Sequence, residues 1–410
     1  MQERFKESKI LVLHIGSFPS KENIPTLNIK NIEPNEIQKF LELHIKESDI
    51  SSVRIIEWRA SLEHYREAYV KLISQVVDFI KRSDASKRTT DAFGKRWVKN
   101  FFKNLKILNK NVLFKQTDIP VIITGSGPSL EEALPIIKEA QKYCYVIASS
   151  SSLLALFNYG ITPDITIATD GGSWALKHMY SFYRSKNSCA LAVNLCAALP
   201  SQCYDTPILL INDGTFWQNI VLHELSLPSV IVPQRGTVTA TAVDFAIHIS
   251  RGSIYLAGMD LSVNDIKSHV RPYAFDQLLI EKSCRFSPVY SQSFLRSSLI
   301  NSGQSLNIYA SWFKTQLNSW PNNIFSIAGK HSIFKEGDLI KQIKNQTQTK
   351  KANEYLNTVN NKNDTSLFCK RGVDVLLKAL KDPQYSENLK QELVPLVGQD
   401  IETSIKELAL

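Results

Sequence analysis

The sequence lacks the patterns that mark several large classes of protein. No run approaches about eighteen consecutive apolar residues, so we expect no membrane-spanning helix. The six cysteines include no C-x-x-C pair and no zinc-type spacing, which argues against a disulfide framework and favours scattered thiols. The first residues, Met1–Phe18, mix charges of both signs and lead directly into a strand-like run, unlike a secretory signal. We therefore expect a cytoplasmic protein.

Acidic residues are fewer than basic ones: the sequence has 39 Asp and Glu and 48 Lys and Arg, which gives a formal net charge of +9. Such a balance suits nucleic acid, an anionic membrane surface, or acidic and phosphorylated substrates. The one dense basic stretch, residues 81–110, carries its apolar residues at helical spacing, as the solvated face of an amphipathic helix does. It contains no nucleic-acid motif. We therefore expect no nucleic-acid partner.

Short β-branched runs alternate with helical runs from Asp118 to Gly258. We predict strands at 120–124, 145–148, 164–169, 190–195, 207–211 and 253–257, and helices at 130–143, 152–159 and 238–250. Strands that are separated by helices build βαβ units around a parallel sheet. The fold class is therefore α/β, with a Rossmann-like central domain and a mainly parallel sheet.

The flanking regions have a different texture. Residues 1–96 are predicted to form a small α/β and helical region, with strands at 9–16 and 55–58 and a helix at 35–46. A long helical stretch at 61–110 begins in this region and continues beyond residue 96. Beyond Asp260 we expect a helix at 306–317, a polar connector at 341–366 and helices across 373–410. We divide the chain into domains 1–96, 97–335 and 336–410.

One strand end has the layout of a phosphate-binding corner. The strand that ends at Thr124 leads into Gly125, Ser126, Gly127, Pro128 and Ser129, after which a helix begins at Leu130. Glycines let the backbone approach a phosphate, and a helix N-terminus offers unpaired N–H groups with a positive dipole end. The loop lacks the third glycine of the dinucleotide fingerprint and has no P-loop lysine. A tight turn capped by Ser129 is the alternative reading.

The next two strand ends carry further candidates. Ser150, within the run Ser149–Ser152, could present its hydroxyl to a ribose or phosphate, although helix capping is the alternative. Asp170 follows a strand at the carboxyl edge, where ligands of open α/β sheets bind, whereas Asp164 precedes the same strand and shapes a turn. These carboxylates do not form a D-x-D pair. We predict a site without metal.

A second cluster lies later in the central domain. Gly236 and Thr237 open a helix, and Arg235 before them could grip a phosphate or carboxylate, with a surface ion pair as the alternative. Asp260 follows the strand at 253–257 and is either a ligand or a loop cap. We include all four residues among the candidates for nucleotide binding.

Several of these motifs resemble known families. The segments Trp97–Asn100, Asn104–Leu105, Gly125–Leu130 and Gly160–Asp164 resemble those of the motility accessory factors, which are bacterial flagellin glycosyltransferases. The central domain is also similar to archaeal 6-hydroxymethylpterin pyrophosphokinases. It is more distantly similar to bacterial sialyltransferases, whose opening loop reads G-N-G-P-S-L and whose Y-A-F-D run matches Tyr273–Asp276. The resemblance covers roughly residues 97–330 and implies a sialyltransferase-like fold.

The resemblance also implies roles for individual residues. The loop Gly125–Ser129 would hold cytidine monophosphate (CMP), Ser150 and Asp170 would lie beside the nucleotide or sugar, and Gly236 would line the same pocket. Tyr273 would donate a hydrogen bond to the departing phosphate. The sequence departs from the sialyltransferase pattern at Ser126, where those enzymes have asparagine, and at Ser262, where a second tyrosine would fall.

Four residues are candidates for the general base. The sialyltransferases use a histidine that follows the tyrosine, and the only histidine after Tyr273 is His331. His269 is nearer but precedes the tyrosine, and Asp170 or Asp260 could serve instead.

The function implied by the resemblance is a metal-independent glycosyltransferase that requires no cofactor. It would move a nonulosonic acid, of the pseudaminic, legionaminic or sialic type, from a CMP-activated donor to Ser or Thr hydroxyls of flagellin. The flanking regions would recognise this acceptor. One alternative is a 6-hydroxymethylpterin pyrophosphokinase that uses ATP and Mg²⁺ held by carboxylates such as Asp164 and Asp170. The other is a non-catalytic flagellin chaperone.

Overall fold

The computed structural model forms two units, Met1–Gly94 and Lys95–Leu410. The boundary falls inside one long helix, α3 (Arg66–Asn104). The structure describes residues 8–16, 24–30, 34–108, 110–184, 189–233, 236–302, 306, 309–310, 313–314, 320, 323–328, 334–344, 350, 356–358 and 367–410.

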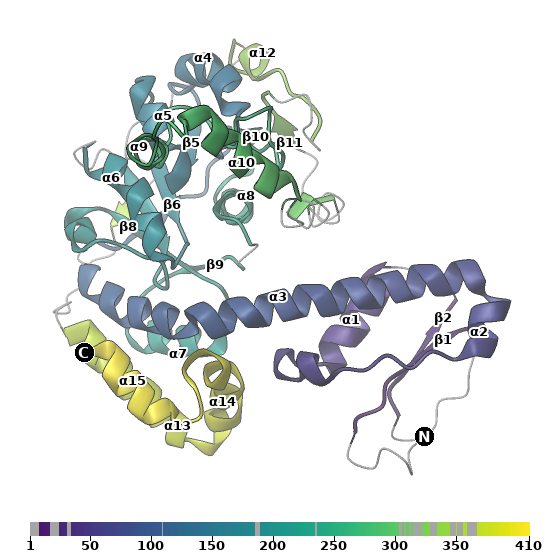
Figure 1. The fold of residues 1–410 in the computed structure, drawn as a ribbon. Coiled ribbons are helices and arrows are strands. Elements are labelled where there is room, and N and C mark those ends of the chain that lie inside the picture. The colour runs from purple at the N-terminus through teal and green to yellow at the C-terminus, as the bar shows by residue number, and fades with distance from the viewer. Residues whose placement is uncertain are drawn as a thin grey trace. The chain divides into compact units, whose positions relative to one another are not determined.

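The first unit contains a small parallel strand pair and helices. Strands β1 (Val12–Ile15) and β2 (Thr26–Ile29) pair in parallel, followed by α1 (Pro34–His44), α2 (Arg59–His64) and the first part of α3 (Figure 1). The strand predicted at 55–58 is wrong: residues 53–58 pair with no strand and are mostly exposed. The sequence did not predict β2, because this strand is only four residues long and two of them, Thr26 and Asn28, are polar. It pairs with β1 in the described structure.

The second unit is built on an eight-stranded, fully parallel sheet. In spatial order its strands are β11 (Ile324–Ser326), β10 (Ile254–Ala257), β4 (Val121–Thr124), β5 (Tyr145–Ser149), β6 (Ile165–Ala168), β7 (Ala190–Asn194), β8 (Ile208–Asn212) and β9 (Val230–Ile231). The six strands predicted for the central domain are all confirmed, and β9 and β11 extend the sheet at its two edges. The Rossmann-like α/β class is therefore confirmed.

Helices cover both faces of this sheet, so its strands are buried on both sides (Figure 1). Alternate strand side chains point to opposite faces. Val146 and Val193 join the core beneath α4 (Leu130–Ala140), α5 (Leu153–Asn158), α6 (Leu176–Arg184) and α7 (Phe216–Glu224). Ile123 and Ile167 join the core beneath α8 (Val238–Ile249).

The remaining elements extend this body. Strand β3 (Val112–Phe114) pairs antiparallel with β12 (Leu356–Thr358), inside the stretch predicted to be a connector. Helices α9 (Asp276–Glu281) and α10 (Val289–Ser302) follow β10, and α12 (Leu339–Lys344) contacts α4. Helices α13 (Phe368–Lys381), α14 (Pro383–Val397) and α15 (Ile401–Ala409) confirm the helical end of the chain. Helices α13 and α14 pack on α7, and α15 packs on α13 and α14. The predicted helix at 306–317 lies largely outside the described residues.

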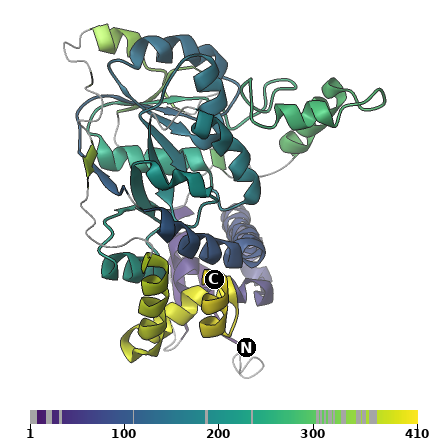
Figure 2. The same cartoon turned by 90° about the vertical axis from the view of Figure 1, so that its left-hand side faces the viewer.

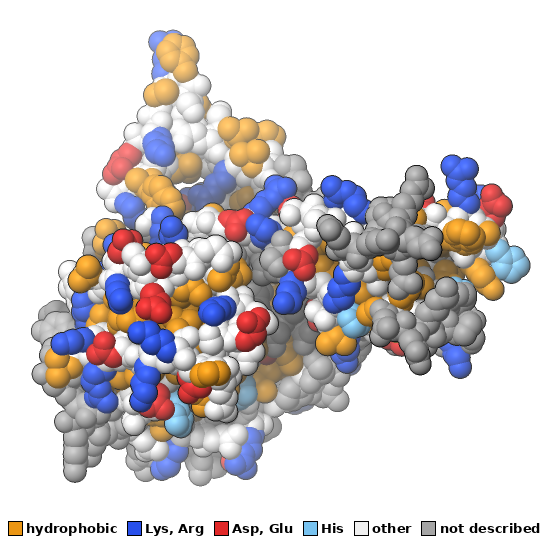
Figure 3. Space-filling view, turned by 90° about the horizontal axis from the view of Figure 1, so that it is seen from below, with side chains coloured by type: hydrophobic (Ala, Val, Ile, Leu, Met, Phe, Trp, Pro, Cys, Tyr) orange, Lys and Arg blue, Asp and Glu red, His pale blue; other side chains and the backbone are white. Residues whose placement is uncertain are grey.

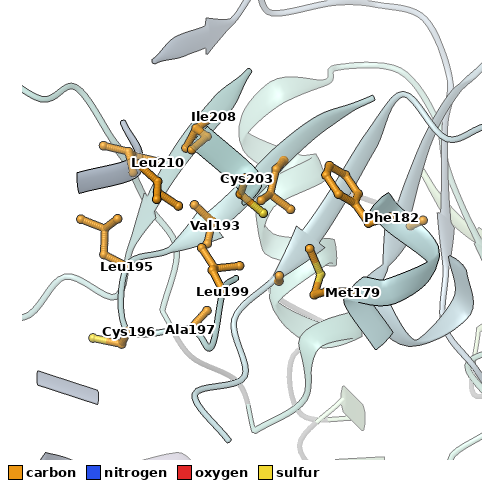
Figure 4. Close-up of a cluster of buried hydrophobic side chains, with 14 of the residues drawn as sticks. Met179, Phe182, Val193, Leu195, Cys196, Ala197, Leu199, Cys203, Ile208 and Leu210 are labelled. Atoms are coloured by element: carbon orange, nitrogen blue, oxygen red, sulfur yellow. The ribbon is translucent and has the colours of Figure 1, made fainter. Parts of the chain in front are cut away.

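All six cysteines are free thiols, and all but the exposed Cys284 are buried. Cys196 and Cys203 lie among the buried apolar side chains beside β7, β8 and α6 (Figure 4). Burial raises the pKa of the Cys196 thiol well above its ordinary value, so the group stays protonated and apolar in character.

Charges on the basic stretch of α3 are partly balanced within the helix. Lys87 pairs with Asp91 at 2.7 Å and Arg88 pairs with Asp84 at 2.9 Å, both at i,i+4 spacing. Charges of both signs are interspersed on the face shown in Figure 3. In the described part of the chain, none of the helices has the length and apolar character needed to cross a bilayer.

A carboxylate on α14 binds the first residues of α7. Glu392 on α14 accepts hydrogen bonds from the backbone N–H groups of Phe216 and Trp217, both at 2.9 Å. These amides begin α7, whose own N-cap, Thr215, makes no side-chain cap bond. Glu392, which is far from α7 in the sequence, therefore caps the N-terminus of this helix in place of Thr215.

We predict that Glu392→Ala lowers the free energy of unfolding by about 1–3 kcal/mol, because two helix-end amides lose a charged acceptor. Chemical denaturation measures the change. Glu387→Ala is the matched control, since this exposed carboxylate accepts a hydrogen bond from Gln391 on the same helix. Equal effects of the two substitutions would contradict the capping role.

Candidate functional site

The strand order creates a switch point between β4 and β10. From β4 to β9 the strands are laid down in succession, and the chain then returns through α8 to place β10 on the other side of β4. In open α/β sheets, ligands bind in the crevice outside the carboxyl ends of the strands at such a point. The loops that begin at Gly125 and Gly258 meet there, and both came from motifs singled out in the sequence.

Glycines let these two loops pack against each other. A Cβ atom on Gly125 would lie 2.4 Å from the carbonyl oxygen of Gly258, and one on Gly127 would lie 2.0 Å from Oδ2 of Asp260. Gly258 itself has a φ of +67°, in the left-handed region that favours glycine. The glycines of the predicted phosphate corner are therefore required for loop-on-loop packing, whatever the loop binds.

Asp260 caps the helix at this corner. Its Oδ2 accepts the Ser129 N–H at 3.0 Å, and the carbonyl of Gly258 accepts the Gly127 N–H at 2.8 Å. The hydroxyl of Ser129 is buried and has no hydrogen-bond partner among the described residues. A phosphate at this corner would have to displace the Asp260 carboxylate, so the role of Gly125–Ser129 in nucleotide binding stays a prediction.

A segment from Lys267 to Tyr273 crosses over the same corner. The Val270 N–H donates to the carbonyl of Ser126 at 2.9 Å, and Glu131 on the first turn of α4 binds both Lys267 and the Arg271 backbone. These bonds hold the 267–273 segment above the switch point. His269 and Tyr273 are thereby brought to the carboxyl edge of the sheet.

The end of α3 positions the loop that carries Asp170. Asn100 Nδ2 donates to the carbonyls of Gly171 and Cys196, at 3.2 and 3.0 Å. Asn104 Nδ2 donates to two carbonyls in the loop after β7. The motif at 97–104 therefore ties together the loops that follow β6 and β7, and so determines where the carboxylate of Asp170 lies.

Aromatic and imidazole rings gather beside Asp170. His269 stacks on Tyr273 with ring centroids 4.2 Å apart, and His178 on α6 lies 5.3 Å from the same phenol ring and 5.1 Å from Phe275. Arg296 on α10 lines the same pocket as Tyr273. Its guanidinium carbon lies 5.8 Å from the centre of that ring. Three elements from separate parts of the sequence thus form one polar cluster.

Burial sets the protonation states in this cluster. It lowers the pKa of His178 to about 4, with a further decrease from Arg296 and opposition from Asp170. Burial also lowers the pKa of His269 to about 4, helped by the positive charge of Arg296. The pKa of Tyr273 rises to about 12 for the same reason, although Arg296 opposes the rise. At neutral pH the cluster therefore contains two neutral imidazoles, a protonated phenol and a guanidinium cation.

Sequence reasoning missed two members of this cluster. His178 follows Asp170 by eight residues on the helix after β6, which is the signal that could have found it. Its Nδ1 is buried without a hydrogen-bond partner among the described residues. Arg296 carries no signal, because α10 reaches Tyr273 only through the tertiary fold.

The other predicted site residues lie away from this cluster or outside the described residues. Ser150 is buried in the turn after β5, and Gly236 begins the α8 turn with Thr237 as its N-cap, whose hydroxyl accepts the Ala240 N–H. Arg235 and His331 lie outside the described residues. Asp164 lies at the amino end of β6, where it is buried and pairs with Lys350 at 2.5 Å. It is therefore at the opposite edge of the sheet from Asp170.

Residues 95–265 match the model of the family described as 6-hydroxymethylpterin diphosphokinase MptE-like. The match confirms the resemblance read from the motifs between Trp97 and Asp170, all of which lie inside it. The MptE-like segment contains β4 to β10 and α4 to α8, the part of the sheet that forms the switch point.

Individual relatives cover a broader or narrower part of the chain. An uncharacterized protein of Treponema pallidum (strain Nichols) is 28% identical over 283 residues, which is 68% of this chain and 60% of that protein. A second one from the same organism is 28% identical over 116 residues, or 28% of this chain and 54% of its own length. The chain thus spans little more than half the length of these relatives.

One solved structure is similar at low identity. It is described as the structure of MAf glycosyltransferase from Magnetospirillum magneticum AMB-1, with a TM-score of 0.41 and 15% identity. The similarity covers 59% of this chain and 38% of that one.

The packing of the two loops in the MptE-like segment generates a mutational prediction. Gly127→Ala is expected to displace Asp260, break its bond to Ser129 and lower the free energy of unfolding by about 1–3 kcal/mol. Asp260→Ala removes the atom with which the new methyl group clashes. In a double-mutant cycle, followed by chemical denaturation, we expect the double variant to lose less than the sum of the single losses. Strict additivity would contradict the contact.

The buried histidines generate a pH prediction. Above pH 6.5 they are neutral in both the folded and unfolded chain, and between pH 6.5 and about 4 only the unfolded chain takes up the protons. Stability should therefore fall as the pH falls through this range, and His178→Leu should flatten the dependence of Tm on pH. His223→Leu, at an exposed position, is the control. An unchanged slope in the His178 variant would show that this imidazole is not protected.

Proposed function

We propose that the chain is a glycosyltransferase that moves a nonulosonic acid from a CMP-activated donor to a hydroxyl group of a protein acceptor, flagellin. The observation that supports this most directly is the cluster at the switch point. A phenol and a guanidinium line one pocket there, beside two neutral imidazoles. Such groups match the two demands of the reaction, which are donors for a leaving phosphate and a base for the acceptor proton.

In the proposed step, the bond between the anomeric carbon of the sugar and the phosphate oxygen breaks. A new bond forms from that carbon to the acceptor oxygen. Tyr273 and Arg296 donate hydrogen bonds to the phosphate as it leaves with the electron pair. His178 takes the proton from the acceptor hydroxyl on its neutral imidazole ring, and Asp170 nearby favours the imidazolium that results. No metal is required for this balance of charge.

A pyrophosphokinase is the second candidate, because the matching family carries that name. The carboxylates suggested for its metal, Asp164 and Asp170, lie at opposite ends of β6. They are separated along the strand by about 20 Å at ~3.3 Å per residue, and Asp164 is already paired with Lys350. These two residues cannot hold one Mg²⁺ ion together, which favours the transferase.

We predict that CMP alone raises the Tm of the purified chain, and that Arg296→Ala weakens CMP binding about ten-fold to a hundred-fold through loss of a charged hydrogen bond to phosphate. A thermal-shift titration measures both. Arg285→Ala is the matched control, since Arg285 is exposed at the tip of the α9–α10 hairpin. Tyr273→Phe should lower kcat for transfer more than it weakens CMP binding, because its hydroxyl assists the departing phosphate.

Two results would redirect the assignment. A rise in Tm with ATP and Mg²⁺ but not with CMP would identify the pyrophosphokinase. Binding of unmodified flagellin, with no response to CMP and no transfer, would identify the non-catalytic chaperone.

A further inference from the structure

Helix α10 leaves most of its large apolar side chains exposed. Its inward positions carry hydroxyl groups: Ser293 is 6% exposed and Ser297 is 3% exposed, and Ser297 Oγ donates to the carbonyl of Ile266 at 2.8 Å. Its outward positions carry large apolar side chains, with Phe294 56% and Leu299 64% exposed. A helix normally buries its apolar face, so this one is arranged to bury it against another molecule.

The exposed apolar surface continues across the whole α9–α10 hairpin. We call it the hairpin patch, and it consists of Ile280, Phe286, Val289, Tyr290, Phe294, Leu295 and Leu299. At the turn between the helices, Phe286 is 95% exposed. The hairpin projects from the body of its unit, as the green helices at the right of Figure 2 show. Figure 3 shows hydrophobic side chains gathered on a projecting part of the visible face.

The patch adjoins the candidate site. Arg296 and Ser293, on the inner side of α10, line the same small pocket as Tyr273 and His269. Leu295, next to Arg296 in the chain, belongs to the patch. An α-helix with its side chains is about 10–12 Å across, so a molecule bound to the patch lies one helix width from the reacting groups. The hairpin is thus placed to hold a macromolecular acceptor beside the site.

Charge indicates the kind of partner. Near the tip, exposed Lys282 and Arg285 have no acidic partner among the described residues, whereas Glu281 accepts a hydrogen bond from Gln277. The chain as a whole carries +9, which opposes association with a second copy. The edge of the patch is complementary to a partner with acidic side chains beside an apolar stripe.

We propose that the hairpin patch is the docking surface for an amphipathic segment of the acceptor protein, apolar on one face and acidic at its edges. This rests on the proposed function, which requires a protein acceptor. Docking on α10 would bring an acceptor hydroxyl toward His178 while Arg296, on the same helix, remains directed at the donor.

The test measures acceptor binding and donor binding separately. Isothermal titration of the full chain with purified flagellin, without nucleotide, gives the first, and the CMP thermal shift gives the second. The variant Phe294→Ser/Leu299→Ser is compared with Leu43→Ser/Tyr159→Ser, which removes two exposed apolar side chains elsewhere. We expect flagellin affinity to fall at least about ten-fold in the patch variant and less than about two-fold in the control. The CMP response should be unchanged in both.

Reversal of charge provides a second variant that leaves the apolar surface intact. Lys282→Glu/Arg285→Glu should weaken flagellin binding and reduce its dependence on salt. Equal flagellin affinity in the wild type and the patch variant would overturn the proposal. So would a wild-type dimer that the patch variant dissociates in sedimentation, or flotation with vesicles containing phosphatidylglycerol that the patch variant loses.

Separate results would overturn the docking proposal and the proposed transferase activity. If the wild type responds to CMP but does not bind flagellin, the docking proposal is overturned while the donor half of the transferase stands. If it binds flagellin through the patch but does not respond to CMP, the docking surface stands and the transferase is overturned.

Discussion

Close packing of two loops at the switch point is the constraint on which the rest of the site depends. Because Gly125 and Gly258 have no Cβ, the backbones of the two loops lie in close contact. Asp260, two residues after Gly258, then accepts a hydrogen bond from the Ser129 N–H at the start of α4. The segment from Lys267 to Tyr273 is then tied down on the same turn. His269 and Tyr273 are carried by this segment, whereas the loop of Asp170 is held by Asn100 on α3.

This arrangement places two neutral imidazoles among charged side chains. Desolvation of the half-buried His178 and His269 lowers the pKa of each ring to about 4, and Arg296 lowers both pKa values further. His269 and Tyr273 share their pocket with Arg271, Asp276 and Arg296. A neutral imidazole can accept a proton and a guanidinium can bind an anion, so the cluster offers both kinds of group at neutral pH. The same helix that supplies Arg296 presents an apolar face to solvent, which links the centre to the outside of the molecule.

The sequence predicted the sheet well and the site unevenly. Strands such as Val121–Thr124 were found because they are buried on both faces and read as continuous apolar runs. Thr26–Ile29 was missed because a short strand at the edge of a two-stranded pair carries little pattern. Among the site candidates, Asp170, His269 and Tyr273 were named and do lie together at the carboxyl edge. His178 and Arg296 were not named, because neither belongs to a motif and only the tertiary fold brings α6 and α10 to Tyr273.

What the sequence determined by itself is local: which runs are strands or helices, and which turns need glycine. These follow from the side-chain period and from backbone sterics, which involve only neighbours in the chain. Only the tertiary structure decided that Asp260 would reach Ser129, that Arg296 would reach Tyr273, and that Asp164 and Asp170 would be apart. Those contacts join residues far apart in the chain, and no local pattern carries the distance between them. The pKa values depend on them too, because burial is a property of the packed molecule.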